Sequence, residues 1–110
     1  MQAPKSGGET RPIFRWSGEY FGFLANDCLF DASGRYVGWV TEEGAAWRAD
    51  GRFLGELVDE NYVLRRDMMI EPIPRIPRIP PIPPIPPIPP IPRLPRIPRL
   101  GWKDALVGPI

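Results

Sequence analysis

Three stretches of the sequence are near copies of one another and read Gly18-Glu19-Tyr20-Phe21-Gly22-Phe23, Gly34-Arg35-Tyr36-Val37-Gly38-Trp39 and Gly51-Arg52-Phe53-Leu54-Gly55-Glu56. Their leading glycines lie 16 and then 17 residues apart. A short fixed period indicates repeated supersecondary units, none of which can bury its apolar face alone. Residues 12–70 are therefore predicted to form a small all-β domain, a ring built from these 16–17-residue repeats.

Each repeat is predicted to be a β-hairpin. A short strand rich in aromatic and aliphatic residues leads into each turn, as in Leu29-Phe30-Asp31-Ala32. The turn Asp31-Ala32-Ser33-Gly34 is typical of a type I turn that ends in a left-handed glycine. A fourth strand, Val63-Leu64-Arg65-Arg66, lacks such a turn because Met68 stands where the glycine would fall. We expect the ring to be completed by residues 68–74 or by a second chain.

The second glycine of each copy lies inside a strand, where glycine costs up to about 1 kcal/mol relative to alanine. Its recurrence predicts a close approach by the backbone or an aromatic ring of a neighbouring unit, with a β-bulge as the alternative. Eleven of the twelve aromatic residues fall between Phe14 and Tyr62, and we expect them to pack the core. The repeat glycines are Gly18, Gly22, Gly34, Gly38, Gly51 and Gly55.

A different rule holds in residues 71–100, where isoleucine or leucine and then proline recur every three residues. Proline lacks the amide donor that helices and sheets need, so the tract is predicted to be a non-globular polyproline II segment with three residues per turn. Each slot of the triplet then forms one face. The faces are an aliphatic stripe, a proline face, and a face with arginine at both ends and proline between.

A straight tract over residues 70–100 would span roughly 95 Å at about 3.1 Å per residue, against about 27 Å for the domain. Soluble monomers rarely expose such a long apolar stripe to solvent. We therefore expect the tract to pair with the same tract of a neighbouring chain, or to lie across the β domain of a neighbouring chain. The predicted interaction residues are Ile79, Ile82, Ile85, Ile88 and Ile91 of the stripe, the arginines Arg75, Arg78, Arg93, Arg96 and Arg99, and Trp102.

The two ends of the chain are polar or short. Residues 1–11 are interpreted as a disordered leader without the features of a signal peptide, and residues 101–110 as a short docking peptide.

The charge is unevenly distributed along the chain. Residues 1–69 carry eight basic and eleven acidic side chains, a net charge of −3. Residues 70–110 carry six basic and two acidic side chains, a net charge of +4. The two parts can attract each other, within one chain or between chains. We expect no membrane span and, by default, a cytoplasmic location.

The sequence offers little for catalysis. There is no histidine, and Cys28 is the only cysteine, so neither a thiol–histidine pair nor a zinc site is expected. The acidic residues fall at turns and connectors without the pattern of a calcium loop. The charge balance does not favour nucleic acid. We predict a protein that is not an enzyme and has no cofactor, metal or small-molecule substrate.

The repeated pattern resembles bacterial beta-flower proteins, which are described as four-fold. The matching stretches are Phe30-Asp31-Ala32-Ser33-Gly34-Arg35-Tyr36-Val37-Gly38-Trp39, the copy from Trp47 to Gly55, and Trp102-Lys103-Asp104 after the proline/arginine-rich tail. The resemblance covers roughly residues 12–104. It implies four hairpins around a pseudo-four-fold axis, and it implies no activity.

Two functions follow as hypotheses. In the first, the protein is structural, and its β domain and aliphatic stripe mediate assembly. In the second, it is a binding module that displays a proline-rich or C-terminal linear motif to a partner protein, with the tract as a stiff spacer. Arg78-x-x-Pro81-x-x-Pro84 matches the basic-first motif that SH3-like grooves bind, although any arginine before this tract would produce the match.

Overall fold

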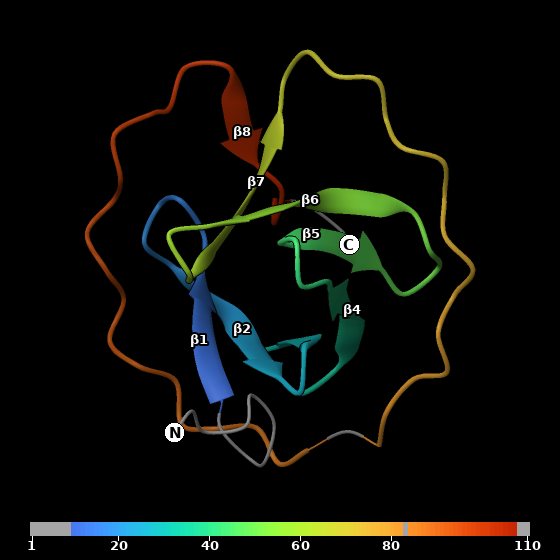
Figure 1. Cartoon of the computed structure of the whole chain (residues 1–110). Coiled ribbons are helices and arrows are strands. Elements are labelled where there is room, and N and C mark those ends of the chain that lie inside the picture. Colours follow the sequence, from blue (N-terminus) through green and yellow to red (C-terminus); the bar gives the residue numbers. More distant parts are fainter. Residues whose placement is uncertain (1–9, 83, 108–110) are drawn as a thin grey trace, which may run out of the picture.

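The computed structural model describes residues 10–82 and 84–107, and the regular structure of these residues consists of eight β-strands. The strands are β1 (Thr10–Phe14), β2 (Tyr20–Ala25), β3 (Cys28–Asp31), β4 (Tyr36–Val40), β5 (Ala45–Arg48), β6 (Phe53–Val58), β7 (Tyr62–Arg66) and β8 (Trp102–Asp104). Each strand pairs antiparallel with the next, and β1 also pairs in parallel with β7 through Phe14 and Tyr62. That pairing closes the first seven strands into a barrel (Figure 1).

The all-β prediction is confirmed, since no described residue lies in a helix. The described residues accordingly contain no helix long and apolar enough to cross a membrane. Strand β1 begins at Thr10, so the predicted boundary of the leader at residue 11 is wrong by two residues. Residues 1–9, the rest of that predicted leader, lie outside the described residues.

Residues with positive φ shape the turns. Gly18, Gly34 and Gly51 have φ of 95°, 92° and 92°, a region that residues with a Cβ rarely adopt. The N–H of each glycine donates to the carbonyl three residues earlier, at 2.8–2.9 Å. On the opposite side of the hairpins, Asn26-Asp27 and Asp59-Glu60 all have φ between 50° and 67°. Consecutive positive φ values are those of turns whose twist matches the strands they join.

The glycines inside the strands allow the backbones of neighbouring strands to approach closely. A Cβ on Gly22 or Gly38 would lie under 3.0 Å from the carbonyl oxygen of Phe30 or Trp47 on the next strand. A Cβ on Gly55 would lie 2.6 Å from the carbonyl oxygen of Leu64. The neighbour is therefore backbone and not an aromatic ring. A β-bulge also occurs in the β1–β2, β3–β4 and β5–β6 pairs.

Apolar side chains from both strands of each pair fill the barrel. The main buried cluster consists of Ile13, Phe21, Leu24, Leu29, Val37, Val40, Ala46, Leu54, Val63 and Leu106. A smaller cluster joins Trp39, Trp47 and Phe53. Further rings pack edge to face across paired strands, with ring centroids 5.9 Å apart for Phe14–Tyr20 and 6.0 Å for Phe30–Tyr36. Burying rings of this size is the main source of stability that so small a domain has.

The C-terminal peptide completes the sheet beside β7. Strand β8 pairs antiparallel with β7, with Arg66 opposite Trp102 and Leu64 opposite Asp104. The expectation that residues 68–74 or a second chain would complete the ring is therefore wrong. The predicted domain limit at residue 70 is also too early, because residues 102–104 belong to the same sheet.

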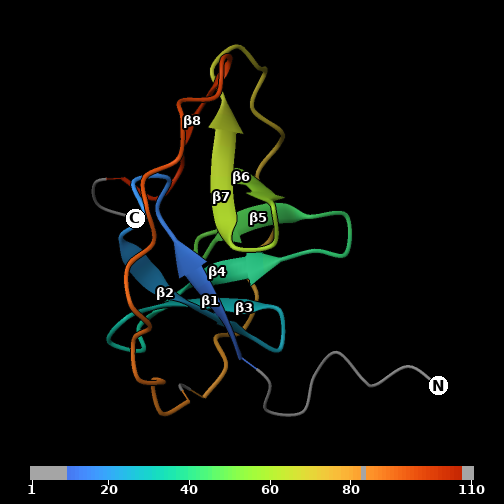
Figure 2. The same cartoon turned by 90° about the vertical axis from the view of Figure 1, so that its left-hand side faces the viewer.

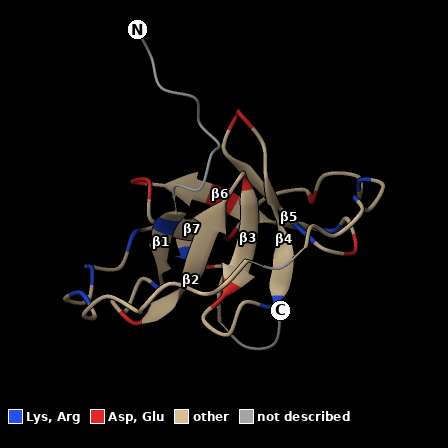
Figure 3. Ribbon diagram, turned by 90° about the horizontal axis from the view of Figure 1, so that it is seen from below, with Lys and Arg blue, Asp and Glu red and all other residues tan. Residues whose placement is uncertain are grey.

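The tract between β7 and β8 runs around the outside of the barrel (Figures 1 and 2). It leaves the end of β7, makes one circuit of the strands and returns to β7 as β8. The described part of the chain measures only 36 × 35 × 34 Å, so the expectation of a straight rod of roughly 95 Å is wrong. Residues 70–100 are called the belt below. Basic positions lie along the outer loops of chain on both sides of the strands (Figure 3).

Candidate interaction surface

Backbone hydrogen bonds fix the belt to the hairpin turns of the barrel. The N–H of Arg75 donates to the carbonyl of Gly51, and the N–H of Arg93 to the carbonyl of Gly18, both at 2.8 Å. A Cβ on either glycine would lie under 3.0 Å from the carbonyl oxygen of the same arginine. These two turns need glycine because φ is positive there, and also because a Cβ would collide with the backbone of the belt.

Each belt arginine lies over an aromatic ring of the barrel or of β8. The guanidinium carbon is 4.7 Å from the ring centroid for Arg75 and Trp47, 4.8 Å for Arg78 and Trp39, 4.3 Å for Arg93 and Phe14, 4.6 Å for Arg96 and Trp16, and 5.1 Å for Arg99 and Trp102. A cation–π contact contributes about 0.5–1 kcal/mol at an exposed site. Five of them are comparable with a large part of the net stability of a small domain.

The indole nitrogens of two of these rings are buried without a hydrogen-bond partner in the described structure. Trp39 and Trp47 are 1% and 3% exposed, and their indole nitrogens have no hydrogen-bond partner among the described residues. Arg78 and Arg75 contact these two tryptophans on the ring face and not at the N–H. A guanidinium is planar and weakly hydrated, so it suits such a stack better than an ammonium group does.

The slot of the triplet that carries arginine also faces the barrel at three of its four prolines, and the fourth, Pro90, is exposed. Its prolines Pro81, Pro84 and Pro87 are half-buried, whereas the isoleucines between them are exposed. The belt thus turns its arginines and these prolines inward. Its apolar stripe faces outward.

The outward stripe is apolar throughout. Ile79, Ile82, Ile85 and Ile88 are 92–93% exposed, and Ile91 is 86% exposed. The other aliphatic residues of the belt, from Ile70 to Leu100, are likewise 86–98% exposed, and soluble monomers rarely expose so many aliphatic side chains along one segment.

The C-terminal peptide docks on its own barrel. The backbone N–H of Trp16 donates to Asp104 Oδ2 at 2.9 Å, and Arg15 Nε donates to the carbonyl of Leu106 at 2.9 Å. Leu106 is fully buried and Val107 is 65% exposed. The expectation of a stiff spacer that holds this peptide away from the domain is therefore wrong. Residues 108–110 of the predicted docking peptide lie outside the described residues.

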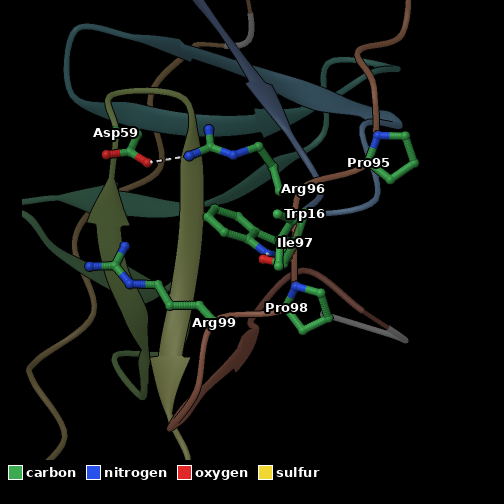
Figure 4. Close-up of a pocket in the computed structure, with 7 residues that line it drawn as sticks. All are labelled: Trp16, Asp59, Pro95, Arg96, Ile97, Pro98 and Arg99. Atoms are coloured by element: carbon green, nitrogen blue, oxygen red, sulfur yellow. Dashed lines mark hydrogen bonds and ion pairs between the residues drawn. The ribbon is translucent and has the colours of Figure 1, made fainter.

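A hollow of about 650 Å³ opens where the belt passes the turn after β1 (Figure 4). Its lining residues are Trp16, Asp59, Pro95, Arg96, Ile97, Pro98 and Arg99. Arg96 donates to Asp59 Oδ2 at 2.8 Å, and Trp16 Nε1 donates to the carbonyl of Ile97 at 2.9 Å. These two bonds join the belt to the barrel at the hollow.

Titratable groups near the belt respond to its arginines. Burial alone would raise the pKa of Tyr62, but hydrogen bonds and charge from Arg93 and Arg96 outweigh burial and lower it. Burial raises the pKa of Cys28, although Arg78 partly opposes this, so the reactive thiolate is disfavoured. Among the described residues, no three histidine, cysteine, aspartate or glutamate side chains come together as metal ligands.

The structure brings together some of the predicted site residues and separates others. The belt arginines meet the barrel rings, and Arg75 and Arg93 also meet two turn glycines, while the isoleucines lie on the opposite side. The sequence pattern did not predict that Trp16 and Asp59 contact the belt, or that Leu106 lies in the core. The density of aromatic residues before the arginine-bearing tract could have indicated the cation–π contacts.

The comparisons with known proteins agree with this architecture. No curated protein and no solved structure matches the chain. Residues 7–105 match the family described as the 4-fold beta flower protein, which covers nearly the whole chain, including the barrel, the belt and β8. The chain belongs to the 4-fold beta flower family.

Proposed function

We propose that the protein is a non-enzymatic structural protein that assembles with copies of itself through the isoleucines on the outside of its belt. The observation that carries the proposal is the exposure of the stripe, from Ile70 to Leu100, at 86–98% per residue. Burying half of its eleven aliphatic side chains would contribute on the order of 7–15 kcal/mol before entropy is subtracted. Because proline stiffens the belt and arginines anchor it, little ordering entropy opposes association.

The finer architecture forms part of the same proposal. We infer that the four strand pairs are copies of one hairpin unit around a pseudo-four-fold axis, and that the belt runs as polyproline II. The length of the belt supports this inference. Trp102 follows Arg66, its partner in the sheet, by 36 residues, or roughly 110 Å at about 3.1 Å per residue. A circle as wide as the molecule, 34–36 Å, has a perimeter of about the same length.

Display of a linear motif is the second hypothesis, and the geometry favours it less. Of the motif Arg78-x-x-Pro81-x-x-Pro84, the arginine lies over Trp39 and the two prolines are half-buried. A reader of this motif would have to lift the belt from the barrel first. A surface that is already open, the isoleucine stripe, is therefore the better candidate for recognition.

Light scattering coupled to size exclusion tests the proposal over a range of concentrations. The parent is compared with I82S/I85S/I88S, and with I82L/I85L/I88L as a control that keeps the stripe apolar. We expect the mass of the parent and of the leucine variant to rise above 12.5 kDa with concentration, and the serine variant to remain a monomer. If the parent stays at 12.5 kDa at the highest concentration and the serine variant behaves identically, self-association is wrong.

A further inference from the structure

Residues 79–92 are the longest run of the belt without a charged residue. They consist only of isoleucine and proline. Two arginines precede the run, ending at Arg78, and three follow it, beginning at Arg93. The five isoleucines of the run are 86–93% exposed. Its described residues follow the lower part of the view in Figure 1, where nothing of the described chain covers the stripe.

The isoleucines of this run are placed symmetrically about Ile85. Two of them lie three residues away on either side, Ile82 and Ile88, and two lie six residues away, Ile79 and Ile91. A stripe that reads the same in both directions from one point presents an equivalent surface after a two-fold rotation about that point. Two copies of the chain can therefore meet there through identical patches with their belts antiparallel, and two-fold contacts are the commonest among homo-oligomers.

The curvature of the belt limits how much of the stripe one neighbouring copy can cover. The belt makes one circuit of a molecule that is 34–36 Å wide (Figure 1). Two copies side by side thus present convex edges, which touch along a short arc. A contact centred on Ile85 is then confined to the isoleucines next to the axis, Ile82, Ile85 and Ile88.

Repulsion between arginines decides where along the stripe the axis can lie. An axis at Ile76 or Leu94 would bring together arginines that lie one and two residues from it in both copies, and like charges oppose association. With the axis at Ile85, the nearest arginines are Arg78 and Arg93, roughly 20–25 Å away along the belt at about 3.1 Å per residue. The two convex edges have separated there by more than the ~8 Å over which physiological salt screens charge.

We propose that two copies associate through an antiparallel contact between their belts, with a two-fold axis at Ile85 and with Ile82 of each copy beside Ile88 of the other. The partner of the stripe is the same segment of a second chain, and not the β domain of that chain. The inference rests on the proposed function, to which it adds the direction, the register and the final size of the assembly, a dimer.

Single cysteines in the full chain test the contact, in a background in which Cys28 is replaced by serine. The variants I85C, I79C, I91C and I76C are treated with a short bismaleimide at a concentration at which the parent associates, and covalent dimers are measured on a denaturing gel. Ile76 is the matched control, because it is 89% exposed on the same stripe but lies next to an arginine.

We expect I85C to link to itself several-fold more than I76C does. I79C and I91C should each link poorly alone, because identical positions six residues from the axis lie roughly 37 Å apart along antiparallel belts at about 3.1 Å per residue. A mixture of I79C and I91C should link, since these two positions face each other across the contact. Light scattering should show the mass of the parent rising to twice 12.5 kDa and no further.

The possible failures separate the two proposals. A parent that stays at 12.5 kDa at the highest concentration would overturn the proposed function and this inference with it. A parent that associates while I79C or I76C links to itself as readily as I85C would overturn the antiparallel contact at Ile85 and leave self-association standing. A mass that grows beyond two chains would do the same.

Discussion

Replacing Leu106 by alanine tests whether the end of the chain is part of the core. Leu106 is fully buried among side chains of the barrel, although it follows the belt and lies close to the C-terminus. Truncating a buried leucine costs about 2–5 kcal/mol through lost burial and the cavity left behind. At about 4–8 °C per kcal/mol for a domain of this size, the melting temperature should fall by roughly 10 °C or more.

Val107→Ala is the matched control, since Val107 is the next residue and is 65% exposed. It should change stability by less than about 0.5 kcal/mol. Thermal unfolding followed by circular dichroism, with tryptophan fluorescence as a second probe, measures both variants. If L106A melts within a degree or two of V107A, the C-terminal peptide does not dock, and the route of the belt back to β7 is wrong.

Three further predictions concern the turns, the belt length and acid stability. Gly51→Ala should lower the free energy of unfolding by roughly 2–3 kcal/mol, because φ at Gly51 is 92° and the new Cβ would displace the belt. Gly101→Ala, where φ is 82° and nothing lies within 4 Å of the new Cβ, should lower it by about 1 kcal/mol. Denaturant titrations measure both variants, and equal losses of stability would count against the belt contact. Deleting residues 85–87 shortens the belt by roughly 9 Å and should expose the Ala105 N–H, bonded to a β7 carbonyl, to hydrogen exchange; unchanged protection would refute the perimeter argument. Burial alone would raise the pKa of Asp31, but hydrogen bonds within its turn outweigh burial and lower the pKa. The ionised Asp31 therefore stabilises the folded protein above the unfolded pKa near about 4, and this contribution is lost as pH falls through the lower folded pKa. The melting temperature should therefore drop on acidification below about pH 4, and D31N should flatten that dependence; an identical profile for both proteins would contradict it.

The local pattern predicted the hairpins because their causes are local. Turn glycines such as Gly34 need positive φ, and the strand glycines leave room for a facing carbonyl, so both recur wherever the unit recurs. The all-β class follows from that recurrence. Strand β8 has no such local cause, since Trp102-Lys103-Asp104 is three residues long and pairs with a strand 36 residues earlier. Only the circuit of the belt brings it there.

The period of three predicted the faces of the belt but not which of them meets the barrel. Hydrophobicity favoured burial of the isoleucines, yet the rim of the barrel presents ring faces and turn carbonyls. Those groups bind a guanidinium and an N–H, and Arg75 and Arg93 offer both. Proline has no N–H and isoleucine has an N–H but no cation, so the arginines are the belt residues that can make both contacts, and their slot turns inward at these points. The stripe then faces solvent because it lies on another side of the same chain.

Small-angle X-ray scattering of the monomer tests most directly whether the belt is wound around the barrel. The variant I82S/I85S/I88S, extrapolated to infinite dilution, removes any contribution from association. A wound belt predicts a radius of gyration close to the 13.7 Å of the Cα atoms. A belt that projects from the domain as a free polyproline segment predicts roughly 25 Å or more, and such a value would contradict the account.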